Sequence, residues 1–307
     1  RLFIPVNGVP AYYVTAVSAT RENEVRSLAS KQNSVQSDTR LTWFKRYAAH
    51  DVSAFGGLRI NWETYTCNKQ LGYNTGSDKT PFMSSGLLNA QSTGNNDVWR
   101  NMDLYMQGNY NYAGRYYAQF NLTASGSSRF GEDADGGVKF GGVVWGIFPS
   151  VQASWVMTNE SWMPKGKGLN YLKLNAGFDL LGNDDINSQA SRTYFTAKRM
   201  FNSISGKTIS NIGNTKLQWE TTARLTAGLQ LSAFNNRLRF QFNYFNANTY
   251  HLLSLSNLSY LTGLQTNWAN GGRIRNEGFD VALDVKLLNL KNWTWSLGAS
   301  AGHYKNT

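Results

Sequence analysis

Apolar and polar residues alternate with a period of two over several long stretches of the chain. In residues 102–112 the apolar positions Met102, Leu104 and Met106 alternate with polar ones, and the pattern resumes in residues 116–123 after the short turn Ala113-Gly114. The same alternation recurs in residues 58–63, 223–233, 238–244, 279–285 and 293–301. This period is typical of β-strands with two different faces, and a short turn between two such strands predicts a hairpin. The chain is therefore predicted to be all-β and antiparallel.

Most of these strands run for about ten residues or more, the length that a tilted strand needs to cross a bilayer. Strands of soluble proteins average about 5–6 residues. Long polar segments at residues 66–101 and 182–215 are predicted to be loops, whereas the turns Ala113-Gly114 and Asn235-Asn236 are short. Short turns on one side and long loops on the other are typical of outer-membrane barrels. Helical spacing is confined to residues 21–28, a segment too short to carry weight.

A soluble β-sandwich is the main alternative, because its strands alternate in the same way. Strand length disfavours it, and so does the placement of aromatic residues. Four tyrosines flank one predicted turn, as in the aromatic girdles that mark the two interfaces of a membrane barrel: Tyr110, Tyr112, Tyr116 and Tyr117. We therefore expect a transmembrane barrel.

Composition and charge agree with a membrane wall. Only 16% of the 307 residues are charged and 14% are aromatic, whereas about a quarter of the residues of soluble domains are charged. No leader segment and no run of about 18 apolar residues is visible. The 30 Lys and Arg exceed the 19 Asp and Glu, giving a net charge of +11. These cations are scattered, so we expect them to line a lumen and attract anionic lipid or lipopolysaccharide, and we do not expect nucleic-acid binding.

The residue types that carry enzyme chemistry are sparse. His50, His251 and His303 lie far apart, and Cys67 is the single cysteine. The acidic groups Glu132, Asp133, Asp135 and Asp184, Asp185 offer oxygen ligands to Ca²⁺, but neither forms a complete binding loop. The sequence therefore predicts no enzyme, no resident metal and no cofactor, with a loop Ca²⁺ site as the alternative. A barrel protease or lipase would need acids and histidines converging at one rim.

Several segments resemble those of a known family and occur in the same order. They are residues 110–117, 126–131, 145–155, 172–183, 214–222, 234–238 and 270–279. Together they resemble the barrel of SusC/RagA-like TonB-dependent transporters of Bacteroidetes. The chain departs from the family pattern at Thr123, Ser125 and Thr215, where that pattern has Arg, Asp and Pro.

The resemblance implies a partial barrel. Residues 1–307 would form a segment of one transmembrane domain, about ten strands of a barrel of some 22, with the plug domain and the remaining strands outside this chain. Ten strands are too few to close so large a barrel, and an open edge in lipid would leave backbone groups unpaired.

The resemblance also implies a function in the bacterial outer membrane. That function is TonB-driven import of glycan oligosaccharides or peptides, with the TonB complex and a SusD-type surface lipoprotein as partners. The alternative is a SusC-like barrel that serves as a structural scaffold in an outer-membrane complex. Aromatic residues on long loops suit sugar rings, and four are predicted to contact substrate: Tyr73, Trp99, Tyr260 and Trp268. Their alternative role is to anchor the barrel at the membrane interface.

Overall fold

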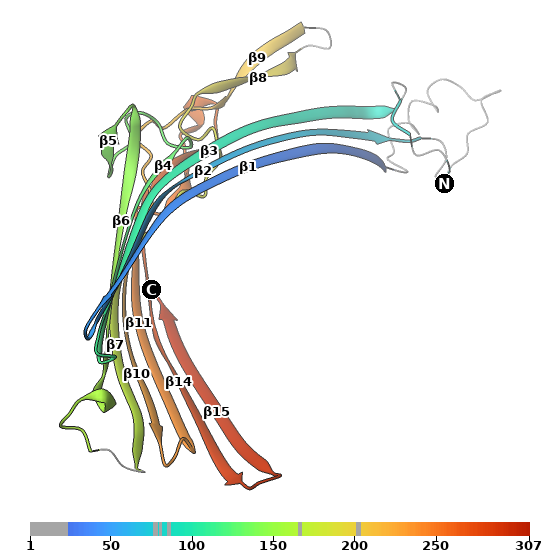
Figure 1. Ribbon diagram of the computed structural model, residues 1–307. Helices are drawn as coiled ribbons and strands as arrows, with labels where there is room; N and C mark the ends of the chain where they lie inside the picture. The colour runs from blue at the N-terminus through green and yellow to red at the C-terminus, as the bar shows by residue number, and fades with distance from the viewer. Residues whose placement is uncertain (1–23, 76–78, 80–81, 85–86, 165–167, 201–203) are drawn as a thin grey trace. The chain divides into compact units, whose positions relative to one another are not determined.

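The computed structural model describes residues 24–75, 79, 82–84, 87–164, 168–200 and 204–307. The chain divides into two compact units, residues 1–35 with 62–99 and residues 36–61 with 100–307. The main sheet runs through its strands in chain order, with β5 (Val138–Phe140) added beside β6 (Figure 1). Its ten successive strands are β1 (Glu24–Tyr47), β2 (His50–Tyr73), β3 (Leu88–Tyr112), β4 (Tyr116–Ser127), β6 (Val143–Val156), β7 (Leu169–Asn183), β10 (Glu220–Ala233), β11 (Leu238–Tyr250), β14 (Arg273–Asn289) and β15 (Thr294–Asn306). From β3 to β15 every neighbouring pair is antiparallel, as predicted.

The connections of the second unit differ in length between the two ends of the sheet. At one end, here called the turn end, the connections are residues 48–49, 113–115, 157–168, 234–237 and 290–293, and the third carries the 3-10 turn η1 (Met157–Asn159). At the opposite loop end they are residues 128–142, 184–219 and 251–272. The last two contain the hairpins β8 (Tyr194–Met200) with β9 (Ile204–Asn211) and β12 (Leu253–Asn257) with β13 (Thr266–Asn270), the latter pair joined through η2 (Tyr260–Thr262).

The predicted turn chemistry is confirmed between β10 and β11. Asn235 and Asn236 have φ angles of 57° and 61°, in the left-handed region that asparagine tolerates better than most residues. Ala113 and Gly114 likewise have φ angles of 52° and 67° in the turn between β3 and β4. Both tight turns therefore lie where the sequence pattern predicted them.

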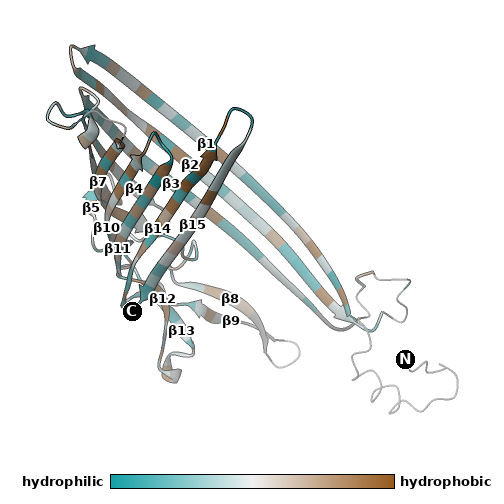
Figure 2. Ribbon diagram, turned by 90° about the horizontal axis from the view of Figure 1, so that it is seen from below, coloured by the Kyte–Doolittle hydropathy of each residue, from teal (hydrophilic) through white to brown (hydrophobic). Residues whose placement is uncertain are grey.

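The sheet of the second unit has one apolar and one polar face. Strand pairing aligns Phe120, Val151, Phe178 and Leu225 in one row across four strands, and these side chains are 41–53% exposed. The positions between them, such as Arg224 and Asp179, face the other side. Figure 2 shows the alternation as successive brown and teal bands along the strands. Because no second sheet covers the apolar face among the described residues, the arrangement is that of a membrane wall and differs from a sandwich.

Two predicted loop segments contain strands, so the sequence prediction is wrong there. β2 continues to Tyr73 and β3 begins at Leu88, within residues 66–101, and β8 and β9 lie within residues 182–215. The helical spacing at residues 21–28 does not correspond to a helix over residues 24–28, which belong to β1. Residues 21–23 lie outside the described part. β1 is exposed along its whole length except at Val25. The residues of β1 do not alternate between apolar and polar types along the strand, so the period-two signal is absent there.

The described residues include no helix with the length and apolar character needed to span a membrane.

Candidate functional site

The connections at the loop end share a small apolar core. Leu217 is fully buried and Trp219 is 6% exposed. The connection after β4, the connection after β7 and strand β6 all supply residues to this cluster, here called the loop core, and Phe148, Leu253 and Trp268 pack against it. Its buried members are Phe130, Ala134, Val144, Ile186, Ala190, Leu217 and Trp219. The loops are therefore fixed by packing against one another at the mouth of the wall.

Three aromatic rings organise the loop core. The ring of Trp219 lies 5.0 Å from that of Phe130 and 5.4 Å from that of Phe148, measured between centroids, and it meets Phe148 edge to face. The Phe148 ring occupies the space above Gly146 and Gly182, where an added Cβ would collide with it. Glycine at both positions therefore lets Phe148 lie flat against the sheet and reach Trp219.

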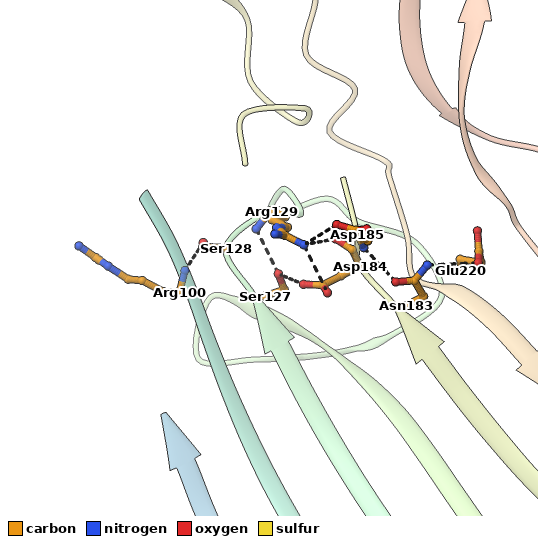
Figure 3. A network of polar contacts seen from close by, with 8 residues as sticks. All are labelled: Arg100, Ser127, Ser128, Arg129, Asn183, Asp184, Asp185 and Glu220. Carbon is orange, nitrogen blue, oxygen red and sulfur yellow. Dashed lines mark hydrogen bonds and ion pairs between the residues drawn. The ribbon is translucent and has the colours of Figure 1, made fainter. Parts of the chain in front are cut away.

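A polar network ties the end of β4 to the end of β7 (Figure 3). The Ser127 hydroxyl donates to Asp184 Oδ2 at 2.6 Å, and Arg129 Nη1 donates to the Asp184 carbonyl oxygen at 2.7 Å. The same guanidinium lies 3.6 Å from Asp184 Oδ1 and 3.8 Å from Asp185 Oδ1. Because the side chains of Asp184 and Arg129 are only 18% and 19% exposed, this ion pair is better shielded from solvent than a surface pair.

Asn270 joins the connection after β11 to the start of β10. Its Nδ2 donates to the carbonyl oxygens of Gln218 and His251, each at 2.8 Å, and its Oδ1 accepts from the Gln218 N–H at 2.9 Å. The side chain thus pairs with one backbone unit in the manner of a neighbouring strand. This three-bond contact holds β13 against the segment that contains the buried Leu217.

Glu220 and Asn214 reinforce the same junction. Glu220 accepts from the Leu253 N–H at 3.0 Å and from Asn183 Nδ2 at 3.3 Å. Asn214 Nδ2 donates to the Trp268 carbonyl oxygen at 3.1 Å. None of these polar residues was predicted to have a role, although Asn214, Glu220 and Asn270 all lie within the segments that carry the family resemblance. In this protein those segments supply the contacts that position the loops.

The polar face of the sheet carries charged side chains that are paired or hydrogen-bonded to neighbouring strands. Arg224 Nη2 and Nε lie 2.9 and 3.0 Å from Asp179 Oδ2, and the Ser150 hydroxyl donates to Asp179 Oδ1 at 2.5 Å. Asn243 Nδ2 donates to Asp280 Oδ2 at 2.7 Å. Ser125, which stands where the family pattern has Asp, donates to Asp103 of the facing strand at 2.6 Å. The face therefore offers hydrogen-bonding groups to a polar solute.

A cavity of about 340 Å³ lies on the polar face toward the turn end. Phe44 and Tyr117 give the cavity aromatic surface, and its polar lining consists mainly of amides with one lysine and one aspartate: Asn109, Asn111, Gln119, Gln152, Lys173 and Asp51. Such a lining favours uncharged polar groups such as peptide bonds and sugar hydroxyls.

A buried carboxylate fastens two connections at the turn end. Glu160 is 5% exposed, accepts from Trp155 Nε1 at 3.0 Å and from Arg115 Nη1 at 3.2 Å, and also hydrogen-bonds the Tyr116 hydroxyl. Hydrogen bonds from Tyr116, Trp155 and Arg115 hold the pKa of Glu160 below its ordinary value, against the opposing effect of burial. Nothing in the local sequence marks this glutamate, because Arg115 lies 45 positions earlier in the chain and Tyr116 follows it.

The four predicted substrate contacts occupy different environments. Tyr73 is buried at the end of β2 and Trp99 is half-buried in β3, both in the first unit. In the second unit, Trp268 is half-buried against the loop core, and Tyr260 begins η2 with its side chain outside the described part. Their contact with substrate stays a prediction.

The acidic loop residues are partly engaged by cations. Asp133 Oδ1 lies 3.9 Å from Lys139 Nζ, and Asp184 and Asp185 both face Arg129. Within the described residues, no three His, Cys, Asp or Glu side chains form a group able to hold a metal ion.

Comparisons with known proteins agree with this architecture. A family described as "TonB dependent receptor-like, beta-barrel" matches residues 7–307. TonB-dependent receptor P39 of Formosa agariphila is 28% identical over 260 residues, which are 84% of this chain and 24% of that protein. TonB-dependent receptor SusC of Bacteroides thetaiotaomicron is 26% identical over 197 residues, 62% of this chain and 19% of that protein.

A solved structure of the RagAB peptide transporter superposes with a TM-score of 0.79 at 21% identity and covers 92% of this chain and 31% of that chain. The predicted fold class, part of an outer-membrane β-barrel, is confirmed. The chain spans about a quarter of the length of the curated relative P39.

Proposed function

Because the chain belongs to the TonB dependent receptor-like β-barrel family of the bacterial outer membrane, we propose that the whole protein imports nutrient fragments across that membrane. The polar face of the sheet is the observation that carries this proposal. Side chains such as Arg224, Asp179 and Asn243 line it while the opposite face is apolar. A wall of this kind lines a water-filled or plugged path through lipid.

We propose oligosaccharides or peptides as the imported class. Amide and aromatic side chains line the 340 Å³ cavity toward the turn end, and Trp268 packs against the loop core at the opposite, loop end. Peptides and sugars both combine hydrogen-bonding groups with apolar surface, which amides and aromatic rings bind together. The loop aromatics Tyr73, Trp99, Tyr260 and Trp268 are the proposed contacts, and no covalent chemistry is needed.

The proposed partners follow from the relatives. SusC and RagA-like relatives suggest a SusD-type surface lipoprotein over the loop end, and the family name implies energy from TonB. We infer that a plug domain and further strands complete the barrel in the whole protein, since this chain spans only part of its relatives.

Uptake by intact cells tests the proposal. Cells with and without the gene for the full-length protein are supplied with fluorescent oligosaccharides or peptides, with and without a protonophore. Import predicts uptake that requires both the gene and the proton gradient, and co-purification of a surface lipoprotein in mild detergent. Uptake that is independent of the gene, together with loss of other outer-membrane proteins from the complex, would support the scaffold alternative.

A further inference from the structure

The 340 Å³ cavity on the polar face contains one lysine whose charge is not compensated by a neighbouring side chain. Lys173 lies on β7, lines this cavity and is half-buried. Within the described residues its ammonium group makes neither a hydrogen bond nor an ion pair, whereas Arg224 on the same face is paired with Asp179. A half-buried cation has lost part of its hydration, and an anion that enters the cavity would replace it.

The amide and acidic groups on another part of the lining bond one another. Asp51 Oδ2 accepts from Asn111 Nδ2 at 3.3 Å and from Arg46 Nη2 at 3.4 Å. Asn109 Nδ2 donates to the Ser53 hydroxyl at 3.1 Å. Asp51 is the one carboxylate that lines the cavity, and Arg46 already compensates it. The lining therefore has a surplus of one positive charge, at Lys173.

Strand register places two hydroxyl groups near Lys173. Tyr117 of β4 pairs directly with Ser154 of β6, and Ser154 pairs with Asn175 of β7, two residues from Lys173. Residues two apart on a strand share a face, and diagonal neighbours on adjacent strands are about 7–8 Å apart, within reach of a long side chain. Neither hydroxyl makes a hydrogen bond within the part of the chain that the structure describes. Three donors from three neighbouring strands are thus available in one cavity.

These donors fit a group with a single negative charge. A carboxylate presents two oxygens with about four lone-pair sites, which suits three donors, and its charge balances one ammonium. A phosphate monoester carries about −1.5 to −2 near neutral pH, so one lysine would leave part of its charge uncompensated. Phe44 and Tyr117 add aromatic surface for the apolar face of a sugar ring or for an apolar side chain.

We propose that this cavity binds the carboxylate of an acidic solute on its way through the barrel. Lys173 supplies the charge, and Ser154 and Tyr117 supply hydrogen bonds. Short turns mark the periplasmic side of outer-membrane barrels, so the cavity lies toward the exit of the path. The proposal rests on the proposed import function and specifies its substrates as peptides with a free terminal carboxylate or oligosaccharides that contain uronic acids.

Binding to the purified full-length protein in mild detergent tests the proposal. A dansyl-labelled peptide with a free terminal carboxylate is compared with its terminal amide, and an oligogalacturonate is compared with its carboxyl-reduced form. We expect the acidic member of at least one pair to bind more tightly than the neutral member. Lys173→Gln should weaken binding of the acidic member about tenfold and leave the neutral member within about twofold of the wild type, as loss of a charge-assisted contact predicts. Lys173→Arg should stay within about threefold, because it keeps the charge.

Lys291→Gln is the matched control, since Lys291 is exposed in the connection of residues 290–293 and does not line the cavity. It should bind both members of each pair like the wild type. Equal binding of acidic and neutral members by the wild type would overturn the proposal, as would unchanged binding of the acidic member by Lys173→Gln. Uniform weakening of both members would show that Lys173 pairs with a carboxylate of the protein itself, such as one of the plug domain, and would also overturn it.

Uptake by intact cells separates this result from the import proposal. If uptake requires the gene but Lys173→Gln leaves the ratio of acidic to neutral uptake unchanged, import stands and the carboxylate site fails. If uptake is independent of the gene, import fails, and the binding measurement still decides whether the cavity takes a carboxylate.

Discussion

Replacing Asn270 with alanine should release the loops without unfolding the wall. The side chain makes three hydrogen bonds, of 2.8, 2.8 and 2.9 Å, to the backbones of Gln218 and His251. Each is worth about 0.5–1.5 kcal/mol net, and a buried group left without a partner costs more. Because Asn270 is half-buried, we expect Asn270→Ala to lower the free energy of local opening by about 2–3 kcal/mol.

That change corresponds to an equilibrium constant for local opening about 30- to 150-fold larger, since about 1.4 kcal/mol is tenfold. Hydrogen exchange of the full-length protein in detergent measures it through amides in residues 214–220 and 251–272, which report local opening separately from global unfolding. Amides in the middle of β7 and β10 should exchange as in the wild type, because the backbone ladder between those strands does not involve Asn270.

Asn257→Ala is the matched control, because Asn257 lies on the paired strand β12 and is exposed. It should leave exchange in both segments unchanged. If Asn270→Ala exchanged within twofold of the wild type, the junction would not depend on this side chain. If the acceleration spread through β7 and β10, the loops and the wall would open as one unit, contrary to the reasoning.

Three further predictions concern single contacts in the second unit. Because the folded pKa of Glu160 is lowered, its contribution to stability is complete above the unfolded pKa and is lost as pH falls through the folded value. The difference in Tm between wild type and Glu160→Gln in detergent should therefore shrink below about pH 4, and a constant difference would contradict this. Gly182→Ala should cost about 1–3 kcal/mol by displacing the Phe148 ring, and less in a Phe148→Leu background, as chemical denaturation would show. Arg224→Gln should lower the free energy of unfolding by about 1–2 kcal/mol, because Asp179, which is 4% exposed, loses its guanidinium partner. Adding Asp179→Asn should restore part of this stability in the same denaturation experiment, and losses that simply add would show that the two side chains are not coupled.

The sequence predicted the central part of each wall strand because lipid and lumen act on opposite faces there. Leu225 and Arg224 are neighbours in the chain and face different media, which imposes the period of two. The tight turns at Ala113-Gly114 and Asn235-Asn236 were equally visible, since positive φ angles restrict the residues allowed.

The remainder depended on contacts between distant segments. Residues 27–40 of β1 are exposed along their length, so no alternation identified them as a strand. The bonds of Asn270 join residues 52 positions apart, and Glu160 meets Arg115 across 45 positions. A single sequence carries no local signal for such pairs. The family resemblance marked the segment of Asn270 without indicating what its side chain does.

The shared apolar core at the loop end limits how this protein can change its specificity. Leu217, Phe130 and Val144 come from three different stretches of the chain and bury one another. Replacing one of these stretches with an unrelated sequence would expose the buried apolar side chains of the other two to solvent. A new recognition surface therefore requires matched changes in all three stretches. We therefore expect the loops at this end, together with the adjoining end of β6, to change as a set, while the rest of the strands beneath them stays the same.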